Sequence, residues 1–510
     1  MIGSQPATRL ATMRPSASRR RLTTSMVCFG FIVLSLLVGA WGAVGGWFGQ
    51  AILLLLVLPL LALIFDYRLG LILCIVILPY TNAPFLRGLG LFTVTNLLLL
   101  GTFCAILIRW VLSRMASRHL HLLLPWPVFL LYLLPILIGM FIGTQYLAEI
   151  PPHFITSQGY EVWGVREYWV SYWLKGMLFV FFAFALGGAV IEFGNGRAFI
   201  RIFLISALMF SCVVLALVLL SGASLGQLQG HRGSLGVTGR HNTEAGFLLA
   251  TAIAALLFIR EYQTRFAVRL FLLVMIGVFF TAMMLTFTRG AMLALAAVVL
   301  YYVWHFRRPM ILVTAAIIVV MAVTAMPDAV RDRMLLGIDT ASSASVGPIG
   351  GGDDKLTMGR TWIWVQLIDE IPKAPAFGRG VMSTQWSDLV KRGTYLANHP
   401  HNTYLAIVMD LGIFGLVAMF AFFIFLWRIF SQLCNNEDLT PLERGYFAGS
   451  KAMLVALLVW GFSNGQYFPV TEQIYIWTSI GLALGYYYKV RLSTPVALGR
   501  TEPSTAGTKF

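Results

Sequence analysis

The sequence predicts an all-α polytopic membrane protein with about 12–14 transmembrane helices, both termini in the cytoplasm and one large periplasmic loop that contains short helices. Three observations lead to this fold class. Of 510 residues, 58% are hydrophobic and only 11% are charged, whereas soluble domains carry about 25% charged residues. Apolar runs long enough to cross a bilayer recur along the chain. Basic residues cluster in alternate connections, as loops on the cytoplasmic side do.

The apolar runs divide the chain into five parts. We expect disordered cytoplasmic tails at 1–25 and 489–510, transmembrane helices 1–11 in 26–326, the periplasmic loop at 327–401 and helices 12–14 in 402–488. The expected spans are 26–46, 48–65, 69–80, 91–112, 123–143, 172–191, 198–220, 245–259, 268–287, 290–305, 309–326, 402–427, 446–463 and 472–488. The third is short and is either a span or a re-entrant segment.

The charge distribution orients these spans. With the N-terminus inside, basic clusters at 9–21, 109–118, 260–269, 307–308 and 489–491 all lie in the cytoplasm. The net charge of +16 therefore reflects topology and anionic lipid, and no nucleic-acid partner is expected. The five cysteines lie in spans or on the inner side without a CxxC pair, so neither a disulfide framework nor a thiolate metal site is expected.

The predicted periplasmic loop contains two helical patterns. In "TMGRTWIWVQLIDEI", residues 357–371, Trp362, Val365 and Ile368 recur at helical spacing, and Pro372 ends the pattern. A second short helix is expected at 383–392, with Ser383 or Thr384 as the N-cap and a glycine just beyond its end. We expect both helices to lie along the membrane surface, with their tryptophans at the level of the headgroups.

Unusual polar residues occur at the outer ends of several spans. Arg289 lies in "TFTRGAML", Arg360 opens the first loop helix, and Arg240, His241 and Asn242 lie in "VTGRHNTEAG". Guanidinium groups hold phosphate oxygens bidentately, so arginines gathered at one point would suit a lipid diphosphate. Purely structural roles remain open for these residues. Arg289 could be a snorkelling anchor, and Arg240 and His241 could cap a span.

The stretch "ANHPHNTYLAIVMDLGIFGL", residues 397–416, sets two histidines against the start of a long apolar run. We expect Pro400 in the first turn of a helix, which would put His401 at the positive end of the helix macrodipole. That field favours a neutral imidazole, which can act as a general base. His401 could also be an ordinary interfacial histidine, and His399 with His401 could bind a metal, although no further ligand cluster supports this. Asp410 is out of phase with His401 and is expected to pair with a neighbouring helix.

These residues resemble a known family. His401, Asn402, Gly412 and Gly415 fit a His-Asn, nine residues, Gly-x-x-Gly pattern that resembles the O-antigen ligase and O-antigen polymerase superfamily. "TFTRGAML" resembles the family's Ser-Arg-Gly segment, with Thr288 in place of serine. "GRTWIW" followed by "KAPAFGRGV" resembles its Gly-Arg, Trp, Pro-x-x-Gly-x-Gly run, and "GRHNTEAGFLLA" resembles its asparagine segment. The architecture also resembles the C-type membrane glycosyltransferases.

The resemblance implies a bacterial inner-membrane enzyme with a periplasmic active face. It would move a glycan from undecaprenyl diphosphate to an acceptor hydroxyl, on a glycan or on the lipid A core, without a metal or other cofactor. Arg289 and Arg360 would hold the diphosphate, and His401 would activate or orient the acceptor. The expected substrate-binding residues are Arg240, His241, Asn242, His399, Asn402 and Arg379.

The family pattern leaves the subclass open. We favour a polymerase of envelope or exported polysaccharide slightly over a lipopolysaccharide ligase, because both share the motif. A transporter or flippase of lipid-linked oligosaccharide is the main alternative. It predicts charged side chains at mid-membrane depth, whereas here most lie at the outer ends of the spans. A structural membrane protein would leave the histidine and arginine positions unexplained.

Overall fold

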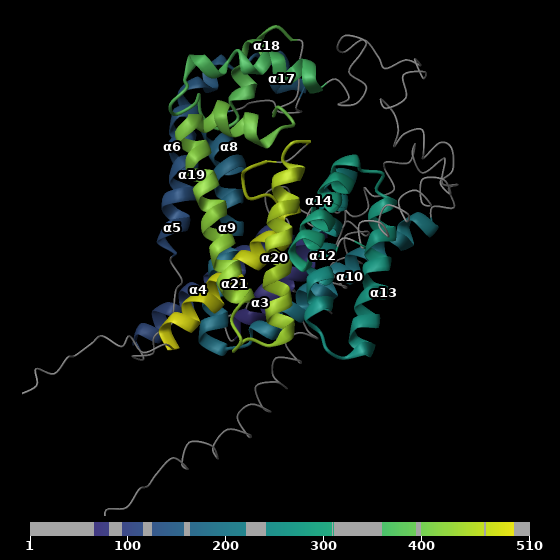
Figure 1. Cartoon of the computed structure of the whole chain (residues 1–510). Coiled ribbons are helices and arrows are strands. Elements are labelled where there is room, and N and C mark those ends of the chain that lie inside the picture. The colour runs from purple at the N-terminus through teal and green to yellow at the C-terminus, as the bar shows by residue number, and fades with distance from the viewer. Residues whose placement is uncertain are drawn as a thin grey trace, which may run out of the picture.

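The protein is described by a computed structural model that covers residues 66–80, 94–115, 125–157, 164–220, 241–308, 310, 360–393, 399–463 and 466–493. Within these ranges every regular element is a helix. The long helices run side by side as a bundle, and a group of short helices covers one end of it (Figure 1). The fold class predicted from the sequence, an all-α polytopic membrane protein, is confirmed.

The first half of the bundle is built from helices before residue 221. These are α3 (Tyr67–Ile77) with the 3₁₀ turn η1 (Leu78–Tyr80), α4 (Val94–Met115), the continuous helix α5–η3–α6–η4 (Trp126–Glu149), α7 (Pro152–Ser157), the continuous helix α8–η5–α9 (Val165–Phe193) and α10 (Gly196–Leu220).

The second half contains helices α12 (Asn242–Tyr262), α13 (Phe266–Met284), α14 (Arg289–Phe306), α17 (Arg360–Ile368), η7 (Ile371–Lys373), η8 (Ser383–Trp386), α18 (Asp388–Lys391), α19 (Thr403–Cys434), α20 (Pro441–Trp460), η9 (Thr471–Gln473) and α21 (Ile474–Ser493). Every predicted span within the described ranges corresponds to one of these helices. The predicted spans 26–46, 48–65 and 309–326 lie outside the described residues.

Seven helices of the described chain are long and apolar enough to cross a membrane. They are Trp126–Glu149, Val165–Phe193, Gly196–Leu220, Asn242–Tyr262, Phe266–Met284, Arg289–Phe306 and Thr403–Cys434. Their outward surfaces carry large apolar side chains such as Phe141, Phe266 and Leu300, each more than half exposed. Such a continuous apolar exterior is stable against lipid and not against water.

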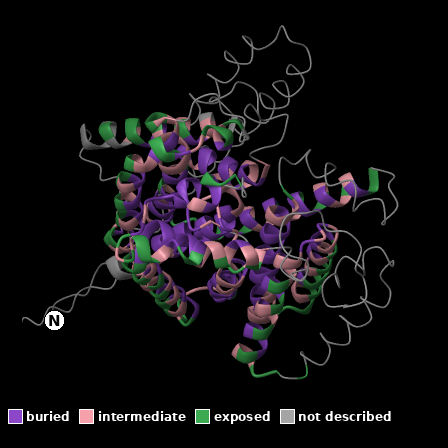
Figure 2. Cartoon of the chain, turned by 90° about the horizontal axis from the view of Figure 1, so that it is seen from above, coloured by how far each residue is buried: buried purple, intermediate pink, exposed green. Residues whose placement is uncertain are grey.

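Helix α12 forms the centre of the second half, where most of its residues are buried. Gly445 and Gly449 of α20 lie one turn apart and pack directly on the α12 backbone at Ile259 and Ala255. Small residues at this spacing let two helix backbones approach closely, which is how helices associate in a bilayer. Seen from above, buried residues fill the middle of the bundle and exposed residues line its outside (Figure 2).

The connection between α14 and α19 differs from the prediction in its details. Helix α17 buries Ile363 and Leu367, whereas Val365 and Ile368, expected to mark one apolar face, are 57% and 52% exposed. The single helix predicted at 383–392 is split into η8 and α18, because Ser387 is extended (φ −68°, ψ 156°). Trp386 is fully buried and stacks on Tyr146, so it anchors this segment to the bundle rather than to headgroups.

Helix α19 is broken at Gly412, whose φ of 68° and ψ of −168° are not helical. A segment of the preceding connection, residues 375–381, lies across the break. The N–H groups of Ile413 and Phe414 donate to the carbonyls of Pro375 and Ala376, and the N–H of Arg379 donates to the Met409 carbonyl. Backbone groups freed inside a membrane helix must find such partners. These hydrogen bonds at the break therefore attach the connection to α19, close to the beginning of that helix.

Gly380 in this segment offers a test of the interlock. It has a φ of 89° and packs so closely on Gly143 of α6 that an added Cβ would overlap the Gly143 backbone. Replacing Gly380 by alanine should lower the free energy of unfolding by about 2–5 kcal/mol, since backbone strain and overpacking add. Thermal unfolding of the purified protein in detergent measures the effect.

The matched control is Gly277→Ala on the exposed side of α13, where an added Cβ meets nothing within 4 Å. This change should leave stability equal or raise it by about 0.5–1 kcal/mol, as alanine is the better helix former. Equal unfolding temperatures for the two variants would contradict the interlock.

Candidate functional site

The last residue of α20 and the turn that follows it, Trp460–Ser463, together called the α20 end, contact the beginnings of two helices from the middle of the chain. Its Trp460 ring stacks on Phe247 of α12 with the ring centroids 4.1 Å apart. Gly290, next to Arg289, packs against the same end, because an added Cβ there would lie 2.6 Å from Ser463 Oγ. Helices α12 and α14 therefore begin side by side at this end of the bundle, which we call the site end.

The α20 end also contacts the beginnings of α17 and α19. The N–H of Thr403, the first residue of α19, donates to the Gly461 carbonyl at 2.8 Å. The guanidinium of Arg360, the first residue of α17, donates to the Ser463 carbonyl. Trp364, one turn further along α17, donates its indole N–H to the Pro400 carbonyl at 2.9 Å. These bonds hold the first predicted loop helix and the segment with the two histidines together at the site end.

Four helices thus begin at the site end, around one short segment of α20. Each helix N-terminus carries a partial positive charge, and two of these helices start with an arginine, Arg289 and Arg360. The arrangement favours an anion with several oxygens, such as a diphosphate. Of the predicted arginines, Arg240 lies outside the described residues.

His401 lies at the site end but not inside a helix, so the predicted first-turn position is wrong. Helix α19 begins two residues later because the side chain of Asn402 accepts hydrogen bonds from the N–H groups of Tyr404 and Leu405 and caps the helix. His401 has a φ of 53°, a left-handed backbone that a residue with a Cβ adopts only where its surroundings hold it. The imidazole is therefore presented just before the positive end of α19 and not from within it.

His399 and His401 form a close pair. Their rings meet edge to face, with centroids 4.2 Å apart. Burial lowers the pKa of His399 from 6.5 to about 4, and the positive charge of Arg360 acts in the same direction. Within the described ranges, no group of three or more His, Cys, Asp and Glu side chains is arranged to hold a metal ion.

His241 caps α12. Its Nδ1 accepts the N–H of Thr243 at 3.4 Å and contacts the Thr243 hydroxyl at 2.9 Å. This geometry agrees with the capping alternative that the sequence left open. Asn242 is the first residue of α12, so both residues lie at the site end together with the start of α14.

Asp410 is bound by the start of the short helix η8 and, beyond the expected helix, by the segment before η9. Its buried carboxylate accepts hydrogen bonds from the N–H groups of Met382 and Ser383, from the Ser383 hydroxyl and from the Tyr467 hydroxyl, at 2.6–2.8 Å. Four donors around one carboxylate stabilise its charge in the interior. Asp410 therefore tightens the junction between the 375–383 segment, α19 and the segment before η9.

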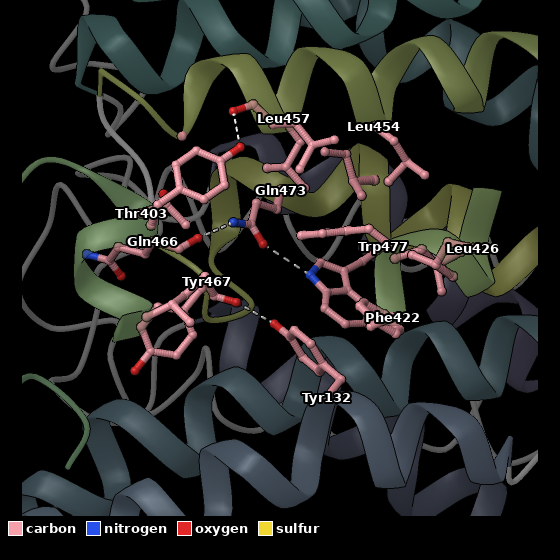
Figure 3. A pocket seen from close by; sticks show the side chains of 17 residues that line it. Tyr132, Thr403, Phe422, Leu426, Leu454, Leu457, Gln466, Tyr467, Gln473 and Trp477 are labelled. Carbon is pink, nitrogen blue, oxygen red and sulfur yellow. Dashed lines mark hydrogen bonds between the residues drawn. The ribbon is translucent and has the colours of Figure 1, made fainter. Parts of the chain in front are cut away.

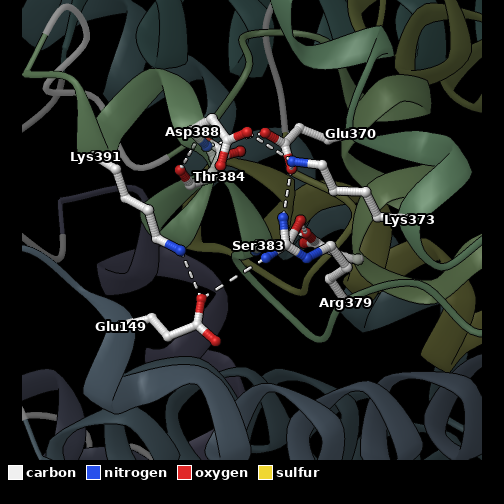
Figure 4. Close-up of polar contacts among 10 residues, drawn as sticks. Glu149, Glu370, Lys373, Arg379, Ser383, Thr384, Asp388 and Lys391 are labelled. Atoms are coloured by element: carbon white, nitrogen blue, oxygen red, sulfur yellow. Dashed lines mark hydrogen bonds and ion pairs between the residues drawn. The ribbon is translucent and has the colours of Figure 1, made fainter.

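Arg379 lies in a separate ion-pair cluster, together with Glu370, Lys373, Glu149, Asp388 and Lys391 (Figure 4). Its guanidinium donates to Glu370, which is only 4% exposed, and lies over the Tyr146 ring. The cluster joins the end of α6–η4 to η7 and α18. The structure thus gives Arg379 carboxylate partners away from the α20 end that gathers the other predicted residues.

A pocket starts at the site end and runs between α19, α20 and α21 (Figure 3). Thr403, Tyr404 and Gly461 line its upper part, and its deeper walls are apolar: Phe422, Leu426, Leu454, Leu457, Ile476 and Ile480. Gln473 is tied to the Gln466 carbonyl and to the Trp477 indole. The pocket therefore has a polar opening and an apolar interior between α19, α20 and α21.

Comparison with known families identifies the segment that carries most of this geometry. Residues 275–420 match a family described as O-antigen ligase. This part of the chain is therefore similar to the O-antigen ligase family. The matched segment spans the end of α13, helices α14, α17 and α18, and α19 to just beyond its break, and it includes Arg289, Arg360 and His401. The match confirms the resemblance to the O-antigen ligase and polymerase superfamily. No curated protein gives a significant match to the chain.

Two parts of the site lie outside the matched segment, residues 275–420. The start of α12 precedes it, and the α20 end at Trp460–Ser463 follows it. Sequence reasoning missed the α20 end because Gly461, Phe462 and Ser463 have no chemistry of their own. Their contribution is made by backbone carbonyls and by close packing. The only sequence signal was the glycine at the outer end of a predicted span, which is too common to single out.

Proposed function

We propose that this O-antigen ligase-type protein transfers a glycan from undecaprenyl diphosphate to an acceptor hydroxyl at the periplasmic face of the bacterial inner membrane. The observation that carries the proposal is the meeting of four helix N-termini, Arg289 and Arg360 among them, with His401 around the end of α20. The proposed roles are diphosphate binding for Arg289 and Arg360 and acceptor activation for His401.

The chemistry fits these groups. The acceptor oxygen attacks the anomeric carbon, the bond from that carbon to the diphosphate oxygen breaks, and the acceptor proton passes to the His401 imidazole. Negative charge develops on the departing diphosphate. Preorganised guanidinium groups and helix N-termini stabilise such charge without rearranging during the reaction. The products are the lengthened or transferred glycan and undecaprenyl diphosphate.

The apolar pocket supports a lipid-linked donor. It begins beside Thr403 and Gly461, next to the proposed diphosphate position, and continues between α19, α20 and α21 at membrane depth. Its apolar walls suit contact with part of a polyprenyl chain whose remainder stays in the bilayer. A soluble sugar nucleotide has no hydrocarbon chain that could contact these apolar walls.

Polymerase remains slightly favoured over ligase, since the described residues carry no feature specific to one acceptor. A flippase is the alternative from another class. It would need charged side chains along a path through the bilayer, whereas the deeper walls of the pocket are apolar.

Analysis of lipids and surface glycans in cells that lack the protein tests the proposal. Loss of a polymerase leaves surface chains of one repeat, and loss of a ligase leaves long chains on undecaprenyl diphosphate with an unmodified lipid A core. In both cases the intermediate lies on the periplasmic side, where added glycosidase reaches it in spheroplasts. An intermediate that stays on the cytoplasmic side would indicate the flippase. Unchanged lipids and glycans would refute all three.

A further inference from the structure

His399 and His401 are connected by a hydrogen bond within the site end. The backbone N–H of His401 donates to Nδ1 of His399 at 3.2 Å. This is the pattern of an Asx turn, in which a side-chain acceptor binds the N–H two residues further along the chain. The edge-to-face contact of the two rings, 4.2 Å between centroids, adds a second restraint. His399 therefore holds both the backbone and the ring of His401.

The bond defines the protonation of His399. Nδ1 must keep its lone pair to accept the N–H, so the neutral ring carries its proton on Nε2. Burial and the charge of Arg360 disfavour the imidazolium, with the pKa of His399 near 4. The ring therefore stays neutral at physiological pH, and the acceptor at Nδ1 is always present.

The backbone of His401 needs such a restraint. A φ of 53° costs on the order of 1–3 kcal/mol for a residue that bears a Cβ. The neighbours on either side are already fixed, since the Pro400 carbonyl accepts the Trp364 indole N–H and Asn402 caps α19. The bond to Nδ1 of His399 restrains the backbone N–H of His401 itself, and its loss weakens the hold on the left-handed conformation that presents the imidazole.

We propose that His399 is a positioning residue for His401 and does not bind the donor or acceptor through its own ring. Its Nδ1 holds the 401 backbone in the left-handed conformation that aims the proposed base at the acceptor. This inference rests on the proposed function of His401. It assigns the two histidines of the motif different tasks, although the sequence suggests two equivalent polar side chains.

Two substitutions separate positioning from substrate contact. The Oδ1 of asparagine occupies the place of histidine Nδ1 and readily closes an Asx turn, whereas the terminal amide of glutamine reaches the place of Nε2. If His399 positions His401, His399→Asn keeps the transfer rate within about threefold of the wild type. His399→Gln should lower kcat by about 10–100-fold with little change in KM for the donor, as expected for a misplaced catalytic group.

The assay uses the wild-type membrane protein and the undecaprenyl-linked glycan extracted from cells that lack it. His153→Asn and His153→Gln are the matched controls, because His153 is an exposed residue that contacts the Val390 carbonyl away from this motif, and both should keep the wild-type rate. A glutamine variant as active as the asparagine variant would overturn the proposal. Equal loss in both variants, with normal unfolding temperatures, would overturn it as well.

A second readout does not depend on activity. In ¹⁵N-histidine spectra of the full-length protein at neutral pH, the signals lost in His399→Asn identify His399. They should report an unprotonated Nδ1 and a protonated Nε2. A protonated Nδ1 would refute the contact. If the wild-type protein transferred no glycan, the proposed function would fail, while these spectra would still decide whether His399 holds His401 through Nδ1.

Discussion

Replacing His401 by alanine is expected to lower the transfer rate by about 10²–10⁴-fold, the range that a positioned general base contributes. The imidazole is the proposed acceptor of the proton that leaves the attacking hydroxyl. Donor binding should change little, because the proposed diphosphate contacts come from other helices. The measurement compares kcat and the donor KM for purified wild-type and variant proteins.

The stability of the His401→Ala protein must be followed in the same preparation. Alanine also has a Cβ, so it keeps the strain of the left-handed backbone, and its unfolding temperature should stay near the wild-type value. His401→Gly relieves that strain and removes the base, so it should be as inactive as the alanine variant although it is no less stable. Wild-type activity in either protein would refute the assignment of His401.

Replacing Arg360 by methionine is expected to lower kcat by about a hundredfold or more, the effect of removing one charge-stabilising donor. Arg360 is the first residue of α17, and its guanidinium donates to the Ser463 carbonyl. The group is therefore held in place before the proposed donor binds. Arg360→Lys keeps the charge but loses the planar fork, and it should recover only part of the rate. Arg289→Met at the start of α14 should act in the same direction.

Two controls make this result specific. Arg269 lies near the start of α13, at the opposite end of the bundle, and pairs with Glu261 at 3.7 Å. Arg269→Met removes one positive charge there and should leave the transfer rate unchanged. The combined Arg289 and Arg360 variant should lose less than the product of the single losses, because both arginines are proposed to act on one diphosphate. Equal effects at Arg269 and Arg360 would point to a general charge effect instead.

The junction at Gly412 explains how distant segments can be held at one end of a membrane bundle. A continuous α19 would satisfy its own backbone and offer the preceding connection nothing to bind. The break exposes carbonyl and N–H groups, and residues 375–381 bind them. Asp410, two residues before Gly412, secures the next residues through Met382 and Ser383. The motif glycine and the Pro-x-x-Gly-x-Gly run are thus two sides of one contact.

The amino-acid sequence was sufficient to predict the fold class and the long apolar helices of the described residues. An apolar run of membrane-spanning length directly predicts a helix, since a bilayer leaves a hydrophobic segment few alternatives. The order of the arginine and histidine motifs was also enough to predict an O-antigen ligase-type protein, which the match to residues 275–420 bears out. These signals are local, so each could be recognised from neighbouring residues.

Only the tertiary structure decided how the candidate site is assembled. The start of α19 moved from Pro400 to Thr403 because an Asn402 cap outweighed a proline signal. Arg379, adjacent to the other motifs in sequence, turned to Glu370 because a buried carboxylate nearby needed a cation. The α20 end contacts the beginnings of four helices through two backbone carbonyls and the Trp460 ring. Such groups are common in sequences and do not identify a site. Such contacts depend on which surfaces meet in space, and that depends on the packing of the whole bundle.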